Sequence, residues 1–232
     1  MSPLGPEVLA ERVAAVHQRI ADAGGDPAEV RILAVAKGFG PDAVRAALAV
    51  GLVDIGENYA QELVAKASAL ETHAPRAPRW HAIGRLQRNK VRQLASLVIC
   101  WQSVDREALG REIARRAPGA SVLVQVNVSG EAAKGGCRPA EAGELVRRLS
   151  DLGLVVDGLM TVGRTGPPAD ARAGFALLRH LADDLGLAER SMGMTSDLEA
   201  AVGEGSTQVR VGRALFGERP QRQVEGPGTA LG

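Results

Sequence analysis

Near the start of the chain a lysine closes an apolar run: Lys37 follows residues 32–36 and stands directly before Gly38. Lysine is almost never fully buried without a partner, so we expect a nearby group that uses its amine. Partial desolvation lowers the pKa of a lysine toward the neutral form, which can attack a carbonyl carbon. Lys37 is therefore a candidate Schiff-base lysine.

A second group of residues, near the end of the chain, suits an anion. In QVRVG (208–212), strand alternation puts Val209 and Val211 on one face and Arg210 on the other, so Arg210 is expected to point into the interior of a closed sheet. A buried guanidinium keeps its proton and needs an acceptor. The acceptor is either an internal salt-bridge partner such as Asp54 or a bound ligand.

The segment before this strand adds hydroxyl groups. Ser196, with Glu199 three residues later, predicts a capping box that opens a short helix, and Thr195 stands beside it. The free N–H groups and the dipole of a helix start favour negative charge. Capping alone accounts for Ser196, but a cap, an inward Arg210 and the small Gly212 together are better explained by a phosphate-bearing ligand.

These residues need a fold that brings both ends of the chain together. Short β-branched runs alternate with amphipathic helical patterns, which predicts right-handed βαβ units and parallel strands. The strand candidates are 31–37, 53–58, 80–84, 97–104, 121–127, 156–162, 189–194 and 207–212. Eight such units favour a closed (β/α)₈ TIM barrel, in which the carboxyl ends of the strands form the site and phosphate binds after strands seven and eight.

An open, doubly wound sheet is the alternative architecture. It would need a Gly-rich phosphate turn after the first strand, and KGFG (37–40) is not G-x-G-x-x-G. We expect one barrel domain over residues 1–219, with an extra N-terminal helix over residues 6–23. The Gly-, Pro- and polar-rich residues 220–232 are expected to be disordered.

Composition and charge narrow the classes of function. The 232 residues carry a formal net charge of +1, so no global field gathers nucleic acid or an anionic membrane. No segment reaches membrane-spanning length, and Glu11 and Arg12 interrupt the N-terminal pattern where a signal peptide would be apolar. Cys100 and Cys137 lack metal-ligand spacing and are expected to be free thiols. We expect a cytoplasmic protein with small-molecule or protein partners.

An anion site on one side of a barrel mouth and a lysine on the other fit a phosphorylated aldehyde held as a Schiff base. Pyridoxal 5′-phosphate (PLP) meets these demands, and so does the sugar-phosphate intermediate of an aldolase. The residues alone do not separate the two ligands.

Several motifs, taken together, resemble the pyridoxal phosphate homeostasis proteins, relatives of the barrel domain of alanine racemase. Each motif alone is weak, but they span nearly the whole chain and their joint order makes the match specific. They are AVAK (34–37), GENYAQE (56–62), WHAIGRLQRNK (80–90), VNVSGEAAKGG (126–136), GLMTV (158–162), SMGMTSDLEAAV (191–202) and STQVRVGRALFGER (206–219).

The resemblance implies an alanine racemase-like barrel that binds PLP and acts in vitamin B6 homeostasis. By this resemblance Lys37 forms the internal aldimine, Asn58 is a polar residue beside the ring, and Arg210 faces the pyridine nitrogen. The full set of implied cofactor-binding residues is Lys37, Asn58, Met194, Thr195, Ser196, Arg210 and Gly212.

Two further positions follow from the resemblance. The hydroxyls of Thr195 and Ser196 and the amide region of Gly212 resemble a phosphate cup. Arg213 replaces a small hydroxyl residue common in the family, and its side chain either forms an ion pair with the phosphate or turns to solvent. Lys134 matches a family lysine and is expected to assist release of the cofactor.

The resemblance favours a carrier or regulator over an enzyme. An arginine beside the pyridine nitrogen disfavours its protonation and weakens the ring as an electron sink. Alanine racemase works with such an arginine but uses a tyrosine from a second domain, and this chain has one tyrosine, Tyr59, and no second domain is expected. We expect a monomer that serves apo-enzymes, with a PLP-dependent amino-acid racemase as the alternative.

The remaining polar residues have less specific explanations. His81 either flanks the ring or is a structural histidine that forms hydrogen bonds. Helical or surface segments hold His17, His73 and His180. A basic cluster without interleaved aromatic residues, typical of a solvated or partner-docking face, is formed by Arg85, Arg88, Lys90 and Arg92.

Overall fold

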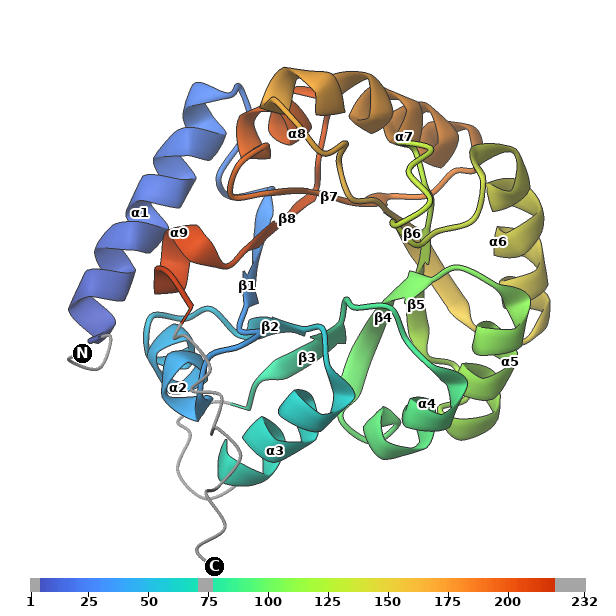
Figure 1. Cartoon of the computed structure of the whole chain (residues 1–232), viewed down its shortest axis with the longest axis horizontal. Coiled ribbons are helices and arrows are strands. Elements are labelled where there is room, and N and C mark those ends of the chain that lie inside the picture. Colours follow the sequence, from blue (N-terminus) through green and yellow to red (C-terminus); the bar gives the residue numbers. More distant parts are fainter. Residues whose placement is uncertain (1–4, 71–76, 220–232) are drawn as a thin grey trace, which may run out of the picture.

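The computed structural model describes residues 5–70 and 77–219. The predicted disorder of residues 220–232 and the position of His73 lie outside this part of the chain. Eight parallel strands close into a barrel in sequence order (Figure 1), so the predicted TIM barrel is confirmed and the open sheet is wrong. The strands are β1 (Arg31–Val35), β2 (Asp54–Glu57), β3 (Arg79–Ala82), β4 (Val98–Val104), β5 (Ser121–Gln125), β6 (Val155–Met160), β7 (Glu189–Met194) and β8 (Gln208–Val211).

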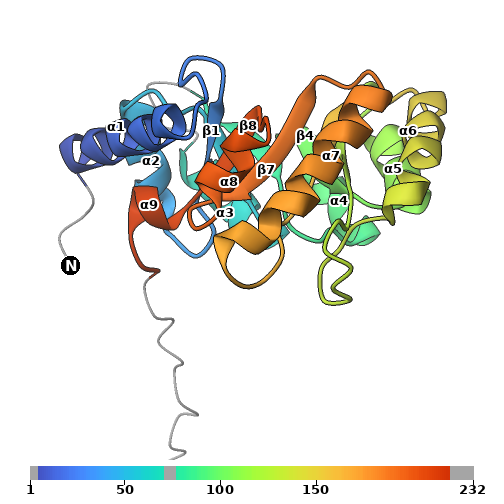
Figure 2. The same cartoon turned by 90° about the horizontal axis from the view of Figure 1, so that it is seen from above.

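Helices surround the barrel on its outside, as Figures 1 and 2 show. They are α1 (Pro6–Asp22), α2 (Pro41–Ala49), α3 (Ala60–Leu70), α4 (Arg88–Leu94), α5 (Glu107–Arg116), α6 (Ala142–Asp151), α7 (Arg172–Asp184), α8 (Leu198–Gly203) and α9 (Arg213–Phe216), with short 3₁₀ turns at Pro139–Glu141 and Pro168–Ala171. In the part of the chain that the structure describes, no helix is long and apolar enough to cross a membrane.

The predicted N-terminal helix is α1, and its burial pattern explains its place. Leu9, Val16 and Ile20 are fully buried and recur on one helical face. This face packs against α8 and α9, on the side of the barrel where β8 pairs with β1. Arg19 at its other end donates to the backbone oxygen of Thr195 at 2.8 Å, so α1 also holds the loop that follows β7.

Most of the apolar core lies between the barrel and its helices. Val209 and Val211 belong to that outer cluster, which leaves Gln208 and Arg210 inside the barrel, as the alternation predicted. The barrel interior carries a small apolar cluster of Cys100, Leu123 and Met160 together with buried polar groups.

A hydrogen-bonded network of polar side chains crosses this interior. His81 bonds through Nε2 to Asp54 Oδ1 at 3.0 Å and through Nδ1 to the Gln102 amide nitrogen at 2.9 Å. Gln102 also donates to Gln208 at 2.5 Å and accepts a hydrogen bond from Ser191 at 2.8 Å. His81 is therefore a buried structural residue, the second of the two explanations considered for it.

Candidate functional site

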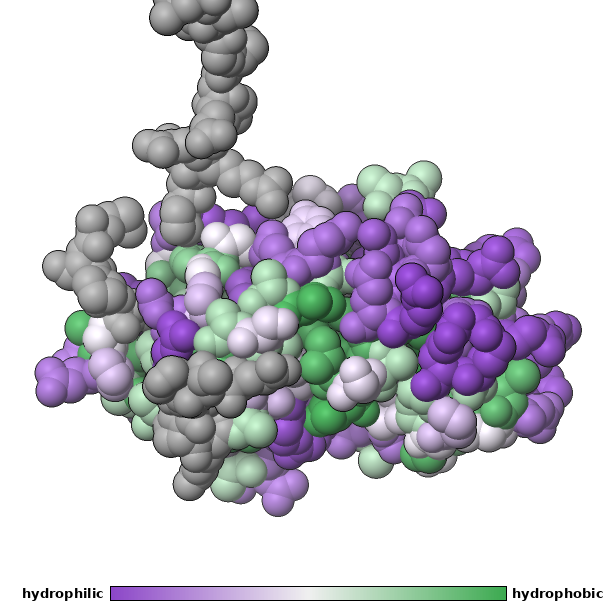
Figure 3. Space-filling view, turned by 90° about the horizontal axis from the view of Figure 1, so that it is seen from below, coloured by the Kyte–Doolittle hydropathy of each residue, from purple (hydrophilic) through white to green (hydrophobic). Residues whose placement is uncertain are grey.

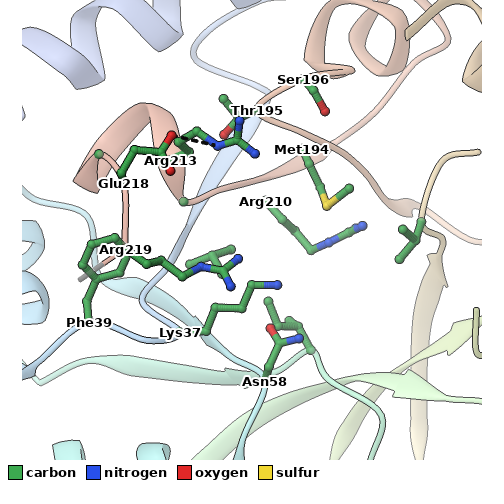
Figure 4. A pocket seen from close by; sticks show the side chains of 15 residues that line it. Lys37, Phe39, Asn58, Met194, Thr195, Ser196, Arg210, Arg213, Glu218 and Arg219 are labelled. Atoms are coloured by element: carbon green, nitrogen blue, oxygen red, sulfur yellow. Dashed lines mark ion pairs between the residues drawn. The ribbon is translucent and has the colours of Figure 1, made fainter. Parts of the chain in front are cut away.

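A pocket with a cavity volume of about 400 Å³ opens at the carboxyl ends of β1, β2, β7 and β8. This is the end of a barrel where binding sites are expected. Phe39, Ile83 and Val162 give it an apolar wall, and Figure 4 shows its polar side chains converging. It brings together every predicted cofactor-binding residue: Lys37, Asn58, Met194, Thr195, Ser196, Arg210 and Gly212.

Lys37 lies beyond the end of its strand. The prediction placed it at the last strand position, but β1 ends at Val35, and the chain turns at Gly38, where φ is +77°. The Lys37 side chain points toward Arg210 and Asn58 (Figure 4). Burial lowers the pKa of Lys37, and the charges of Arg219 and Arg210 lower it further, against an opposing effect from Glu57. The amine is thus poised closer to its neutral, nucleophilic form.

Asn58 supplies an unsatisfied acceptor. Its side-chain oxygen Oδ1 is buried and has no hydrogen-bond partner among the described residues. An unsatisfied buried acceptor costs about 1–3 kcal/mol, and this one belongs to a residue of the pocket wall. A ligand with a hydroxyl or protonated nitrogen at this point would supply the missing donor.

Arg210 is held by neutral groups. Its side chain is 5% exposed; Nη1 donates to the backbone oxygen of Ser191 at 2.7 Å and to its hydroxyl at 3.0 Å, and Nη2 donates to the backbone oxygen of Thr161 at 2.6 Å. Burial lowers the pKa of Arg210 to about 10, opposed by Asp197, so the guanidinium stays charged at neutral pH.

The suggested salt bridge between Arg210 and Asp54 is wrong. Asp54 instead lies beside His81, at 3.0 Å, and Arg79, at 3.2 Å, at the opposite end of the strands. Arg210 reaches further toward the mouth, where its backbone acceptors are the oxygens of Thr161, directly after β6, and of Ser191, within β7. Two of its five N–H donors have no partner in the described chain and remain for a ligand acceptor.

The capping box predicted at Ser196 is also wrong. Helix α8 begins at Leu198, with Asp197 at its N-cap and no side-chain capping bond. The carboxylate of Asp197 accepts the backbone N–H of Met194 at 2.6 Å, which turns the chain before the helix starts. The Ser196 hydroxyl is therefore not used as a cap, and Ser196 lines the pocket.

The remaining anion-binding candidates surround the start of α9. Gly212 is the N-cap of α9, and a Cβ atom there would lie 3.2 Å from the backbone oxygen of Val35, so a side chain would crowd the neighbouring strand. The Thr195 hydroxyl accepts the backbone N–H of Ala214 at 3.4 Å, which ties the loop after β7 to α9.

Two arginines of this region were not predicted as site residues. Arg213 lines the pocket and forms an ion pair with Glu218 at 3.7 Å (Figure 4). Arg219 lines the same pocket and lowers the pKa of Lys37. With Lys37 and Arg210, the pocket holds four basic side chains against one carboxylate, an arrangement that attracts an anion.

Lys134 lies in a neighbouring cavity. Its amine bonds to Glu131 Oε2 at 2.5 Å and to the backbone oxygen of Gly163. Met194 and Ser196 line both this cavity and the main pocket, so the two spaces adjoin. Lys134 is thus close to the predicted cofactor site but outside it.

The predicted basic cluster lies on the rim at the start of α4. Hydrophilic side chains gather over α4 and α5 on the face shown in Figure 3. In the described chain no carboxylate forms an ion pair with the four cluster residues, Arg85, Arg88, Lys90 and Arg92. Arg85 and Lys90 border a groove that reaches Asn58, which connects the cluster to the pocket.

Comparison with known sequences gives consistent results. The family described as alanine racemase, N-terminal domain, matches residues 9–220. A pyridoxal phosphate homeostasis protein of Pseudomonas aeruginosa is 44% identical over 223 residues, which are 91% of this chain and 96% of the relative. A protein of the same name from Escherichia coli K12 is 34% identical over 228 residues, covering 91% of this chain and 97% of the relative.

Solved structures agree with these matches. PipY of Synechococcus elongatus, with PLP bound, has a TM-score of 0.79 and 34% identity, over 90% of this chain and all of that chain. Alanine racemase of Streptomyces coelicolor has a TM-score of 0.72 at 20% identity, over 94% of this chain but 60% of that chain. The second likeness concerns the fold alone.

Proposed function

Because the chain belongs to the alanine racemase N-terminal domain family and shares 34–44% identity with pyridoxal phosphate homeostasis proteins, we propose that it binds PLP and acts in intracellular homeostasis of this cofactor. One observation carries the proposal: a lysine with a lowered pKa lies in a mostly basic pocket at the barrel mouth. The PLP-bound structure of PipY supports the choice of ligand.

The residues of the pocket fit this cofactor. Bound PLP supplies an aldehyde that an amine can hold as a Schiff base. Lys37 is the amine in our proposal, and its lowered pKa increases the fraction able to attack. The unsatisfied Asn58 oxygen would accept a hydrogen bond from the ring hydroxyl, and the N–H groups of Arg210 that have no partner in the described chain would donate to the ring nitrogen.

The phosphate group is assigned to the other side of the pocket. The hydroxyls of Thr195 and Ser196 and the backbone at Gly212 surround this space, with Met194 at its edge. Arg213 lies beside them, so it contributes positive charge where family members commonly have a small hydroxyl residue.

A carrier role fits the pocket better than racemisation. A charged Arg210 disfavours a proton on the ring nitrogen, which the electron sink of an enzyme would use. Tyr59, the one tyrosine of the chain, is 58% exposed and does not line the pocket, so it is not placed as a second base. We also propose that the protein is a cytoplasmic monomer that delivers PLP to apo-enzymes and does not bind nucleic acid.

Absorbance spectroscopy tests the binding proposal. Wild-type protein titrated with PLP should gain the absorption band of a Schiff base, and Lys37→Ala should lose it while keeping its thermal unfolding transition. Lys90→Ala is the matched control, because Lys90 lies on the rim outside the pocket. A band of equal strength in Lys37→Ala would contradict the assignment, and a colourless wild-type protein would favour an aldolase.

A second assay separates the carrier from the racemase. PLP-loaded protein is incubated with L-alanine or D-alanine, and the optical configuration is followed. We expect no sustained turnover, because Tyr59 does not line the pocket and the one carboxylate among the described lining residues, Glu218, is paired with Arg213. Continuous interconversion of the two enantiomers would defeat the carrier proposal.

A further inference from the structure

Helix α3 holds the backbone on both sides of Lys37. The amine of Lys66 donates to the backbone oxygen of Ala36 at 2.8 Å, and the backbone N–H of Gly38 donates to Glu62 Oε2 at 2.8 Å. These two groups belong to the peptide units that flank the Cα atom of Lys37. Because peptide units are planar, fixing both of them fixes the two backbone dihedrals of Lys37.

Three charged side chains that hold this backbone, Glu57, Glu62 and Lys66, also contact one another. Lys66 is 4% exposed and forms an ion pair with Glu57 at the end of β2, which is 2% exposed. Lys66 also lies 3.4 Å from Glu62, one helical turn away on the same face of α3. We call Glu57, Glu62 and Lys66 the α3 clamp.

A contribution to folding stability does not by itself explain the buried ion pair of the α3 clamp. Removing two charges from water costs free energy that their attraction only partly repays, and an apolar pair of similar size is often as stable or more so. Glu57 Oε2 also has no hydrogen-bond partner in the described chain, which adds to this cost. A buried ion pair at this point therefore calls for a role beyond stability.

Strand alternation explains how one segment serves two purposes. Asn58 lines the pocket, whereas its neighbour Glu57 points the other way, toward Lys66 on α3. None of the three clamp residues lines the main pocket. Glu62 and Lys66 instead border a neighbouring cavity that Lys37 also lines, and the charge of Glu57 raises the pKa of Lys37. The α3 clamp therefore acts on Lys37 through the backbone that carries it and, separately, through this charge. Loss of the Glu57 charge would favour the neutral amine and speed its attack, so a slower reaction points to the backbone.

We propose that Lys66 and Glu62, supported by Glu57, are positioning residues that hold Lys37 in the geometry in which its amine attacks the cofactor aldehyde. The inference rests on the proposed function of Lys37. The amine of a lysine sits on a flexible four-carbon chain, so a mobile backbone increases the number of positions that the amine occupies. A smaller fraction of these positions is then suited to attack on the aldehyde. Loss of the α3 clamp should slow Schiff-base formation without removing any group that touches the ligand.

A double substitution separates positioning from stability. Glu57→Met with Lys66→Met replaces the buried pair by apolar side chains and removes the bond to Ala36. Glu62 loses its ion pair with Lys66, but its side chain is 22% exposed to water. We expect the variant's unfolding temperature to equal or exceed that of the wild type, and its rate of Schiff-base formation to fall by about threefold to tenfold. A wild-type rate in this folded variant would overturn the inference.

A second pair of variants tests the bond on the other side of Lys37. Glu62→Ala removes the acceptor of the Gly38 amide, whereas Glu62→Gln keeps an acceptor oxygen. In the apo-protein, exchange of the Gly38 amide hydrogen, followed by NMR, should accelerate in Glu62→Ala and return toward the wild-type rate in Glu62→Gln. The rate of Schiff-base formation should follow the same order.

A control variant on α6 and two possible negative results separate the α3 clamp proposal from the proposed function. Glu144→Ala removes a helix glutamate whose ion pair with Arg148 lies on the exposed face of α6, and it should change neither rate. If Glu62→Ala forms the Schiff base as fast as the wild type, the α3 clamp has no positioning role, although the proposed function stands. If the wild-type protein forms no Schiff base at Lys37, the proposed function itself fails.

Discussion

The unsatisfied oxygen of Asn58 allows a test in which two measured quantities move in opposite directions. Asn58→Leu replaces the side-chain amide by an apolar group of similar size, which removes a buried acceptor that has no partner in the described chain. Such an acceptor costs about 1–3 kcal/mol. Because Asn58 is only partly buried, we expect the free energy of unfolding of the apo-protein to rise by about 1 kcal/mol, the lower end of this range.

The same substitution should weaken cofactor binding. The variant lacks the acceptor for the ligand, and a hydrogen bond contributes about 0.5–1.5 kcal/mol net, which corresponds to a rise in Kd of roughly twofold to tenfold. Chemical denaturation of the apo-protein gives the first quantity, and titration of the Schiff-base absorbance gives the second. Asn89→Leu, on the exposed side of α4, is the matched control and should change neither.

Two results would refute this reasoning. If Asn58→Leu destabilises the apo-protein, the oxygen is satisfied in solution and is not waiting for a ligand. If the apo-protein is stabilised but the Kd for PLP is unchanged, the oxygen does not contact the cofactor.

Three further predictions concern single groups. Burial lowers the pKa of Lys37 below 10.5, so the unfolded chain binds the lysine proton more tightly than the folded protein does. Lys37→Met should therefore raise the free energy of unfolding of the apo-protein at pH 7, measured by chemical denaturation. This gain in stability should shrink as the pH rises toward 10.5. A gain that grows with pH would contradict this sign. A Cβ atom at Gly84 would lie 2.2 Å from the backbone oxygen of Asn58, so Gly84→Ala should lower the unfolding free energy by about 1–3 kcal/mol and weaken PLP binding. Gly203→Ala, in α8, is the control and should lower neither, because a Cβ atom there meets no atom closer than 3.5 Å. Lys134→Ala should slow transfer of PLP to an apo-enzyme, measured by recovery of that enzyme's activity, and an unchanged transfer rate would count against a role in release.

The sequence was sufficient for the architecture and, together with the family resemblance, for seven of the residues that line the pocket. Eight apolar runs separated by amphipathic helices require parallel pairing, and the alternation in β8 alone placed Arg210 inside the barrel. Lys37 could be singled out because a lysine at the end of an apolar run is unusual.

Other features depend on tertiary contacts that no local pattern reveals. At Ser196, the pattern of a capping box was present, but Asp197 used its carboxylate to close the turn at Met194 and moved the helix start. Arg219 reaches the pocket because the chain folds back after α9, and nothing in its sequence surroundings distinguishes it from a surface arginine. Lys66 resembled an ordinary helix lysine until its contact with Ala36 was known.

Identifying the modified lysine tests the central claim most directly. The protein is loaded with PLP, reduced with borohydride, digested and mapped by mass spectrometry. Our account predicts that the reduced pyridoxyl group is on Lys37, in the peptide that follows β1. A group found on Lys134 or another lysine instead, with Lys37 unmodified, would contradict the account.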